Sequence, residues 1–136
     1  MKIIVPLIFF CFLTVNSFSQ TKQIKGRILD EQLNPIPGAL INDLKNHQSS
    51  IANADGYYII SALIGDTIKY KFVGSTNETR IVVNPQQHIN VILMNKTIND
   101  LGAILTKKQW ERAERKMKRY YDQLEIKADQ SGKWNY

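Results

Sequence analysis

The sequence predicts a mainly β domain followed by one long amphipathic α-helix. Between residues 20 and 96, short apolar and β-branched runs are separated by Gly, Pro, Asn and Asp. No helical periodicity is present before Val91, whereas residues 107–128 contain good helix formers with neither Gly nor Pro. Short strands at such spacing favour an antiparallel sandwich or barrel over a parallel sheet.

The first 19 residues have the pattern of a secretory signal peptide. Met1-Lys2 precedes an apolar run, Ile3 to Val15, and the small residue Ser19 follows it. We expect cleavage after Ser19 and an exported protein of one compact domain with appendages. A membrane anchor is the alternative, but a span needs about 20 residues, and the run is shorter.

Cleavage would remove Cys11, the single cysteine of the 136-residue chain. The mature chain would then have neither a disulfide nor a cysteine metal site nor a cysteine nucleophile. Its charge is uneven: residues 20–105 contain eight Lys/Arg against seven Asp/Glu, and residues 106–136 contain nine against five. The basic character therefore belongs to the C-terminal part.

The strands are expected in order along the domain. In the first, Ile24, Gly26 and Ile28 alternate with polar residues, which is the period of a half-buried strand. Further strands are expected at residues 39–43, 57–60, 67–72, 79–83 and 88–94. The turn residues that separate them include Pro35, Pro37, Gly38, Asp55, Gly56, Gly65 and Gly74.

The stretch NADGYYII raises the question of a calcium loop. If Gly56 is the sixth loop position, the first is Ile51 and the twelfth is Ala62, so both carboxylates that such a loop requires are missing. We interpret the stretch as a tight turn in which Gly56 takes a positive φ and Asp55 braces the chain. A weak cation site from Asp55 and Asn53 is the alternative.

Three segments together resemble the carboxypeptidase-like regulatory domain of exported Bacteroidota proteins: GRILDEQLNPIPGALI, ANADGYYII and GDTIKYKFVG. The resemblance covers Gln23 to about Met94 and implies a transthyretin-like (prealbumin-like) antiparallel β-sandwich of about seven strands without catalytic residues. Two residue pairs depart from the family pattern. Ala52-Asn53 stands where the family usually has Thr-Asp, and Gly74-Ser75 stands where it usually has Gly-Tyr. The matching residues are Gly26, Asp30, Pro35, Pro37, Gly38, Ala39, Asp55, Gly56, Tyr58, Gly65, Asp66, Thr67, Ile68, Tyr70 and Gly74.

The resemblance also implies a cellular location and a role for the protein. In Bacteroidota the domain often precedes an outer-membrane receptor, and a segment like Ile98–Lys108 leads into the next module. Here residues 97–106 would connect the sandwich to a helix, or add a strand. We expect a non-catalytic accessory protein in the periplasm or at the periplasmic face of the outer membrane, without cofactor or metal, in contact with an envelope protein complex.

The predicted helix, residues 107–128, begins with a capping box formed by Thr106 and Gln109. At 100° per residue an apolar, aromatic-rich stripe lies opposite an arginine-rich side. The stripe either packs on the sandwich or meets a partner, since Trp, Tyr, Met and Arg are enriched at interfaces. The candidates for partner binding are Trp110, Arg112, Arg115, Met117, Arg119, Tyr120, Tyr121 and Leu124.

Other partners of the helix are less favoured. An anionic membrane surface suits a basic amphipathic helix, but the apolar side is Tyr-rich rather than Leu-rich, which makes a membrane contact less favoured than a protein partner. Nucleic acid is the least favoured, because the domain is nearly neutral and exported. Residues 129–136 have no periodicity and are expected to form a flexible tail.

A hydrolase and a carbohydrate-binding module are the alternative functions. A hydrolase would use His88 or Asp55, but the two histidines, His47 and His88, stand in no paired or zinc-type spacing, and no G-x-S-x-G motif is present. The C-terminal GKWNY also differs from the Tyr-Arg-Gly-Ser of the transthyretin-like hydrolases. A carbohydrate-binding module would need exposed aromatic side chains, for which the candidates are Tyr57, Tyr58 and Tyr70.

Overall fold

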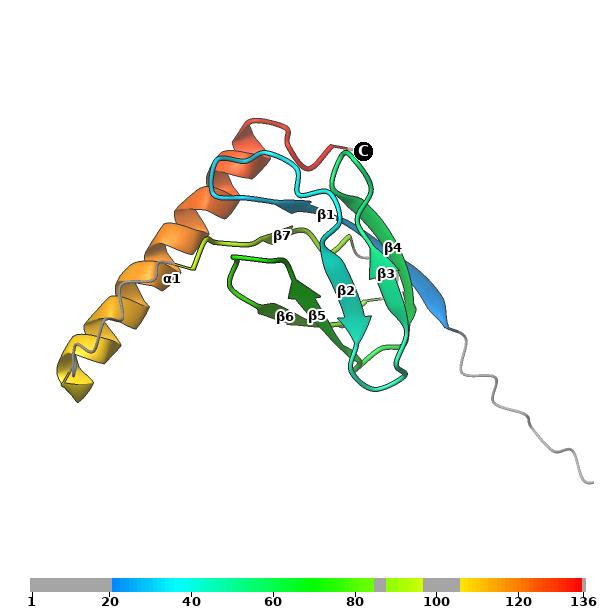
Figure 1. Cartoon of the computed structure of the whole chain (residues 1–136), viewed down its shortest axis with the longest axis horizontal. Coiled ribbons are helices and arrows are strands. Elements are labelled where there is room, and N and C mark those ends of the chain that lie inside the picture. The colour runs from blue at the N-terminus through cyan, green and yellow to red at the C-terminus, as the bar shows by residue number, and fades with distance from the viewer. Residues whose placement is uncertain (1–20, 85–87, 97–105, 136) are drawn as a thin grey trace, which may run out of the picture.

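The structure, a computed structural model, describes residues 21–84, 88–96 and 106–135. Within these residues, seven strands form two sheets, and a C-terminal helix lies beside them (Figure 1). This confirms the predicted class, a mainly β sandwich with a C-terminal helix. The predictions for residues 1–19 and for the connecting segment up to residue 105 lie outside the described residues. The elements are β1 (Lys22–Leu29), β2 (Leu40–Asp43), β3 (Ser49–Ile51), β4 (Tyr57–Ala62), β5 (Thr67–Lys71), β6 (Glu78–Ile81), β7 (Val91–Ile92) and α1 (Lys107–Gln130).

The two sheets have the strand orders β4-β1-β7 and β3-β2-β5-β6. The described pairs are antiparallel, as predicted, with the exception of β1 and β7, which run parallel with Ile28 opposite Val91. A tight hairpin enforces antiparallel pairing, whereas strands far apart in sequence are free of that constraint. The local pattern of residues 88–94 therefore could not specify the direction of β7.

One apolar core lies between the sheets. Ile24 and Ile28 enter it from β1, and Ile68 and Tyr70 enter it from β5; all four are fully buried. Within each strand the two residues are separated by an even number of positions, as the alternation of side chains along a strand requires. The same alternation in the sequence therefore located the core correctly.

Strand β3 was not predicted. Ser49–Ile51 is too short and polar to show an alternating pattern, and it becomes a strand because its backbone pairs with Leu40–Asn42 of β2. Conversely, the strand expected over residues 88–94 shortens to Val91–Ile92, with one isolated bridge between His88 and Lys25.

The turn between β3 and β4 follows the tight-turn interpretation, with one correction. Gly56 has φ +78°, and a Cβ at this position would lie 2.5 Å from the Ile28 carbonyl oxygen. The brace is Asn53, not Asp55 as predicted: the Asn53 amide oxygen accepts hydrogen bonds from the backbone N–H of Asp55 (3.0 Å) and of Tyr57 (2.9 Å). An amide oxygen engaged in this way is not available to a cation.

The other predicted turn residues lie between strands. Gly38, Gly65 and Gly74 have φ between +77° and +87°. Pro35 forms an isolated bridge with Leu29 in the loop from β1 to β2, which also contains Pro37. This loop turns the chain from one sheet to the other.

Candidate protein-interaction site

Helix α1 begins and ends at clear capping structures. The Thr106 hydroxyl accepts a hydrogen bond from the Gln109 N–H (3.4 Å), and the Gln109 side-chain oxygen accepts one from the Thr106 N–H (2.8 Å). This is the predicted capping box. The helix ends at Gln130, two residues later than predicted, where the Ser131 N–H still donates to the Lys127 carbonyl. At 1.5 Å per residue its 24 residues span about 36 Å.

The C-terminal half of α1 packs on the sandwich. Leu124 is 6% exposed and Ala128 fully buried, and they form a second apolar cluster with Leu29, Leu33 and Ile92. Tyr121 and Trp134 pack against this cluster. Burying one leucine side chain contributes about 1.5–3 kcal/mol, so the cluster is sufficient to hold the helix end.

A polar contact reinforces the same attachment. The Arg80 guanidinium of β6 donates to the Tyr121 hydroxyl (2.5 Å) and lies 3.0 Å from Glu78 and 3.7 Å from Glu125. The Ile92 N–H also donates to the Tyr121 hydroxyl (3.3 Å). Burial raises the pKa of Tyr121 to about 12, against the opposing effect of Arg80. Tyr121 is thus neutral at physiological pH and serves as a hydrogen-bonding anchor.

The residues after α1 do not form the free tail that was predicted. The Lys133 carbonyl accepts a hydrogen bond from Arg27 (2.7 Å), and the Asn135 carbonyl accepts one from the Tyr57 hydroxyl (2.7 Å). Trp134, between them, packs on the second apolar cluster. Long-range contacts of this kind leave no periodic signal in the sequence, which is why the prediction was wrong.

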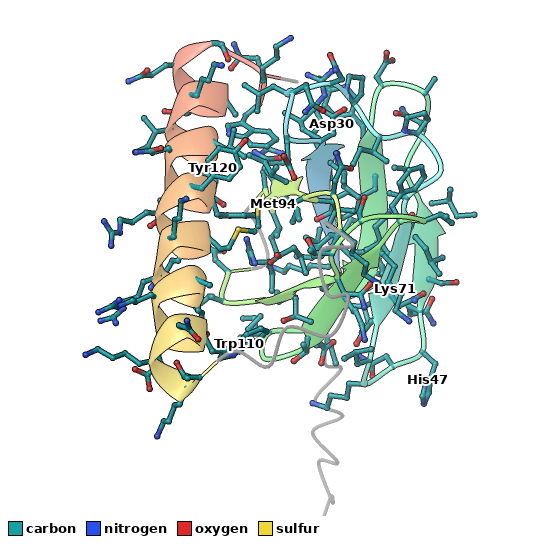
Figure 2. All side chains as sticks on the ribbon, turned by 60° about the vertical axis from the view of Figure 1, so that its left-hand side comes forward. Asp30, His47, Lys71, Met94, Trp110 and Tyr120 are labelled. Carbon is teal, nitrogen blue, oxygen red and sulfur yellow. The ribbon has the colours of Figure 1, made fainter. Side chains whose placement is uncertain are left out.

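The N-terminal half of α1 leaves its apolar side exposed. Trp110 is 60% exposed, Met117 43% and Tyr120 41%. With Ala113, also exposed, they form what we call the exposed stripe. In Figure 1 the first turns of α1 extend beyond the sheets, and in Figure 2 Trp110 and Tyr120 are labelled on the side of α1 nearer the sandwich. The C-terminal half of the predicted stripe is therefore packed on the sandwich, and its N-terminal half is exposed.

A groove of about 480 Å³ runs between α1 and β6. Its apolar part comes from Met94, Met117 and Tyr121, and charged side chains of β6 and α1 surround it. An apolar centre with a charged rim is the usual composition of a protein-binding surface.

The opposite side of α1 holds the predicted arginines. Within the described residues, none of its cations forms an ion pair. Arg115 donates to the backbone carbonyl of Glu111 (3.2 Å) and not to its carboxylate. We call this set the basic row; it consists of Lys108, Arg112, Arg115, Lys116 and Arg119.

The sequence profile of the CarboxypepD_reg-like domain matches residues 24–105, more than half of the chain. The chain belongs to this family. The match confirms the resemblance and extends it beyond Met94 through the connecting segment. No curated protein matches the chain.

Two solved structures resemble this CarboxypepD_reg-like domain in part. Both are type II cohesin–X-dockerin complexes from Acetivibrio cellulolyticus, and each contains a chain with 12% sequence identity and a TM-score of 0.42. Each match covers 52% of this chain and 51% of the other, so the protein spans about half the length of those chains. Among the described residues, no helix is both long and apolar enough to cross a membrane.

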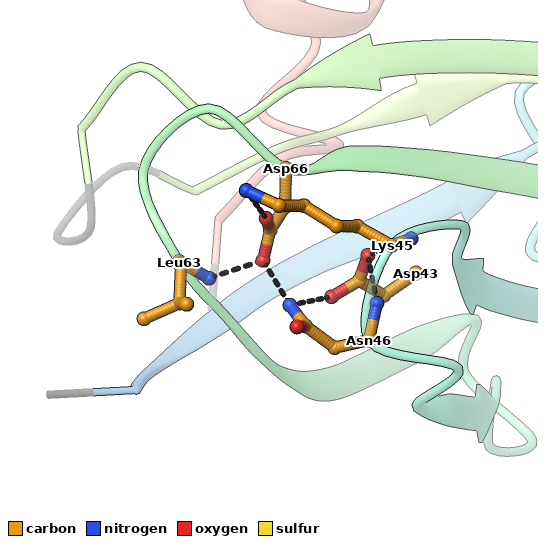
Figure 3. A network of polar contacts seen from close by, with 5 residues as sticks. All are labelled: Asp43, Lys45, Asn46, Leu63 and Asp66. Carbon is orange, nitrogen blue, oxygen red and sulfur yellow. Dashed lines mark hydrogen bonds and ion pairs between the residues drawn. The ribbon is translucent and has the colours of Figure 1, made fainter. Parts of the chain in front are cut away.

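A buried polar network of the CarboxypepD_reg-like domain links two of its turns (Figure 3). The Asn46 side-chain NH₂ donates to Asp43 (2.9 Å) and to Asp66 (2.6 Å). The Leu63 N–H also donates to Asp66 (2.7 Å), and the Lys45 ammonium lies 3.7 Å from its other oxygen. Burial raises the pKa of Asp43, but hydrogen bonds from Lys45 and Asn46 outweigh burial and lower it. The network holds the β2–β3 and β4–β5 turns together.

The alternative sites are not assembled in the part of the domain that the structure describes. His47 lies in the β2–β3 turn of one sheet, and His88 pairs with β1 of the other. Tyr58 and Tyr70 are buried, with their hydroxyls 2.7 Å apart, and thus provide no surface for a sugar. In the described ranges, no three His, Cys, Asp or Glu side chains gather where they could hold a metal ion.

Proposed function

We propose that the protein is an exported, non-catalytic accessory protein of the cell envelope whose CarboxypepD_reg-like sandwich presents α1 to a protein partner. One observation carries this proposal: the apolar side of α1 is buried at Leu124 and Ala128 but exposed at Trp110 and Met117. The sandwich fixes one half of the helix and leaves the other half accessible.

The composition of the accessible half supports a protein as the partner. Tryptophan, tyrosine and arginine supply most of the residues that dominate binding energy at protein interfaces. Burial of the Trp110 and Met117 side chains would stabilise a complex by up to about 1.5–3 kcal/mol each. Because the helix is already formed and anchored, binding does not require the ordering of a free segment, which would otherwise weaken the complex.

The envelope location rests on two features of the sequence. Residues 1–19 have the pattern of a signal peptide, and the chain resembles a domain that is common in exported Bacteroidota proteins. The non-catalytic role is supported by the separation of the two histidines and by the hydrogen bonds that engage Asp43 and Asp66. Fractionation of cells that produce the chain tests the location: recovery in the cytosol with Met1 intact would contradict export.

Site-specific photocrosslinking in cells tests the partner proposal. A photoreactive amino acid at position 110 or 117 should crosslink to one envelope protein, and the same group at Ile59, which is 52% exposed on β4, should not. The variant Trp110→Ala/Met117→Ala should lose this protein in a pull-down while keeping its fold. Equal crosslinking from position 59, or none from either helix position, would contradict the proposal. Deletion of α1 is a poorer test, because it would uncover Leu29 and Ile92.

A further inference from the structure

We propose that the basic row of α1 docks electrostatically on an anionic lipid surface. The arginines of the basic row lie on the side of the helix opposite Trp110 and Met117, and Tyr120 stands at the border, beside Lys116. The inference therefore goes beyond the proposed protein partner and does not depend on it.

The direction of the basic row follows from what anchors the helix. Leu124 and Ala128 are buried against the sandwich, so the opposite side of α1 faces outward. Figure 2 shows α1 beside the sheets with this outer side uncovered by other elements. From Lys108 to Arg119 the row extends for about 17 Å along a straight helix, at 1.5 Å per residue. All five members are exposed.

The row has a positive charge and no direct ion pair. Within the described residues, the ion pairs involve Lys45 and Arg80 as cations and no member of the row. Of the acidic residues of α1, Glu114, Asp122 and Glu125 line the groove on its other flank. Glu111 lies one helical turn before Arg115 and reduces the charge of the row without cancelling its five cations. Each lysine or arginine near an anionic membrane surface adds about 1 kcal/mol of attraction, or about fivefold in partitioning. Five such residues together are sufficient for measurable, reversible binding.

The shape of the row favours a plane of lipid headgroups over an acidic peptide. The hollow between these side chains is lined by α1 alone, from Arg112 to Gln123, so an occupant is contacted from one side only. A flat surface of phosphates meets all five cations at once, whereas a peptide would have to match their spacing without walls to hold it. Insertion into the bilayer is not part of the inference, because the exposed apolar residues Trp110 and Met117 lie on the side of α1 away from the arginines.

Vesicle sedimentation tests the inference with the chain from Gln20 onward, which contains all of the described structure. We expect binding to phosphatidylcholine vesicles that contain phosphatidylglycerol and no binding to phosphatidylcholine alone. Binding should be lost at about 1 M salt, where the Debye length is only ~3 Å and charges farther apart are screened from one another. The variant Arg112→Gln/Arg115→Gln/Arg119→Gln should partition about 100-fold more weakly, at fivefold for each charge. Glutamine keeps the helix propensity close to that of arginine, and circular dichroism checks that the helix persists.

A matched control separates the row from net charge. The variant Lys22→Gln/Lys25→Gln/Lys71→Gln also removes three positive charges, all from exposed strand positions. It should bind like the unaltered chain. Equal loss in both variants, equal binding to neutral vesicles, or no binding at low salt would overturn the inference. Binding to soluble polyglutamate but not to vesicles would also overturn it and would assign the row to an acidic protein.

Discussion

Replacement of Leu124 by alanine should release α1 from the sandwich without unfolding the sandwich. Leu124 is 6% exposed and shares a cluster with Leu29, Leu33 and Ile92. These residues lie outside the core between the two sheets, which contains a separate set of buried side chains. The helix should therefore open as its own cooperative unit, as sub-global openings do in other proteins.

The size of the effect follows from the position of the side chain. Leucine-to-alanine substitutions in closed cores cost about 2.7–5.0 kcal/mol, and the cost falls where the surroundings can collapse. Here a helix covers the cluster and can move toward the sheets, so we expect about 2–3 kcal/mol. At tenfold for each 1.4 kcal/mol, this raises the opening equilibrium of the helix by about 30- to 150-fold.

Native-state hydrogen exchange measures this prediction amide by amide. Amides in the C-terminal half of α1 should exchange faster by that factor, whereas those of β1 and β4 should be unchanged. Met117→Ala is the matched control, because it also shortens an apolar side chain of α1 but at a position that is 43% exposed. A surface change of this kind should shift stability by less than about 0.5 kcal/mol.

Two results would refute the reasoning. If strand amides lost protection together with those of the helix, α1 and the sandwich would form one cooperative unit. If neither changed in Leu124→Ala, the second apolar cluster would not be what anchors the helix. Either outcome would also remove the physical basis for treating the N-terminal half of α1 as a separately presented surface.

Three other perturbations have defined outcomes. Gly26→Ala should lower the urea midpoint strongly, at the upper end of about 1–3 kcal/mol, because its Cβ would lie 1.9 Å from the Ile89 carbonyl oxygen. Burial raises the pKa of Tyr121 to about 12, so tyrosinate absorbance near pH 12 should lose the contribution of one group in Tyr121→Phe. Since this pKa is raised above the unfolded value of about 10, the contribution of Tyr121 to stability is present below pH 10 and is lost as pH rises toward 12. The lowered pKa of Asp43 should make stability fall as acid brings the pH below about 4, and thermal melts of Asp43→Asn should show a flatter acid dependence.

Local patterns were sufficient to predict most of the fold. Alternation of Ile24, Gly26 and Ile28 predicted the buried face of β1, and the Thr106–Gln109 capping box predicted where α1 begins. These signals are visible because each depends on residues that are close in sequence. Strand β3 and the parallel direction of β7 depend instead on partners far along the chain, and no local pattern encodes them.

The division of the helical stripe could not be predicted for a related reason. Trp110 and Met117 have the same helical spacing and apolar character as Tyr121 and Leu124, so the sequence gives both halves the same signal. Which half is buried depends on where Ile92 and the other residues of the second cluster lie relative to the helix axis. The two extra anchors, at Arg80 and at the chain end, were missed because each is a contact between distant segments.

The anchors of α1 explain how one helix can present two different surfaces. Most of the stability of a helix within a protein comes from the packing of its apolar face. Here apolar packing at Leu124, the Arg80–Tyr121 contact and the bond from Arg27 to Lys133 fix the C-terminal end of α1. The N-terminal turns continue the same helix from this fixed end. Both the exposed stripe and the basic row thus keep a defined direction relative to the sandwich, and neither a protein nor a membrane would have to order the helix in order to bind it.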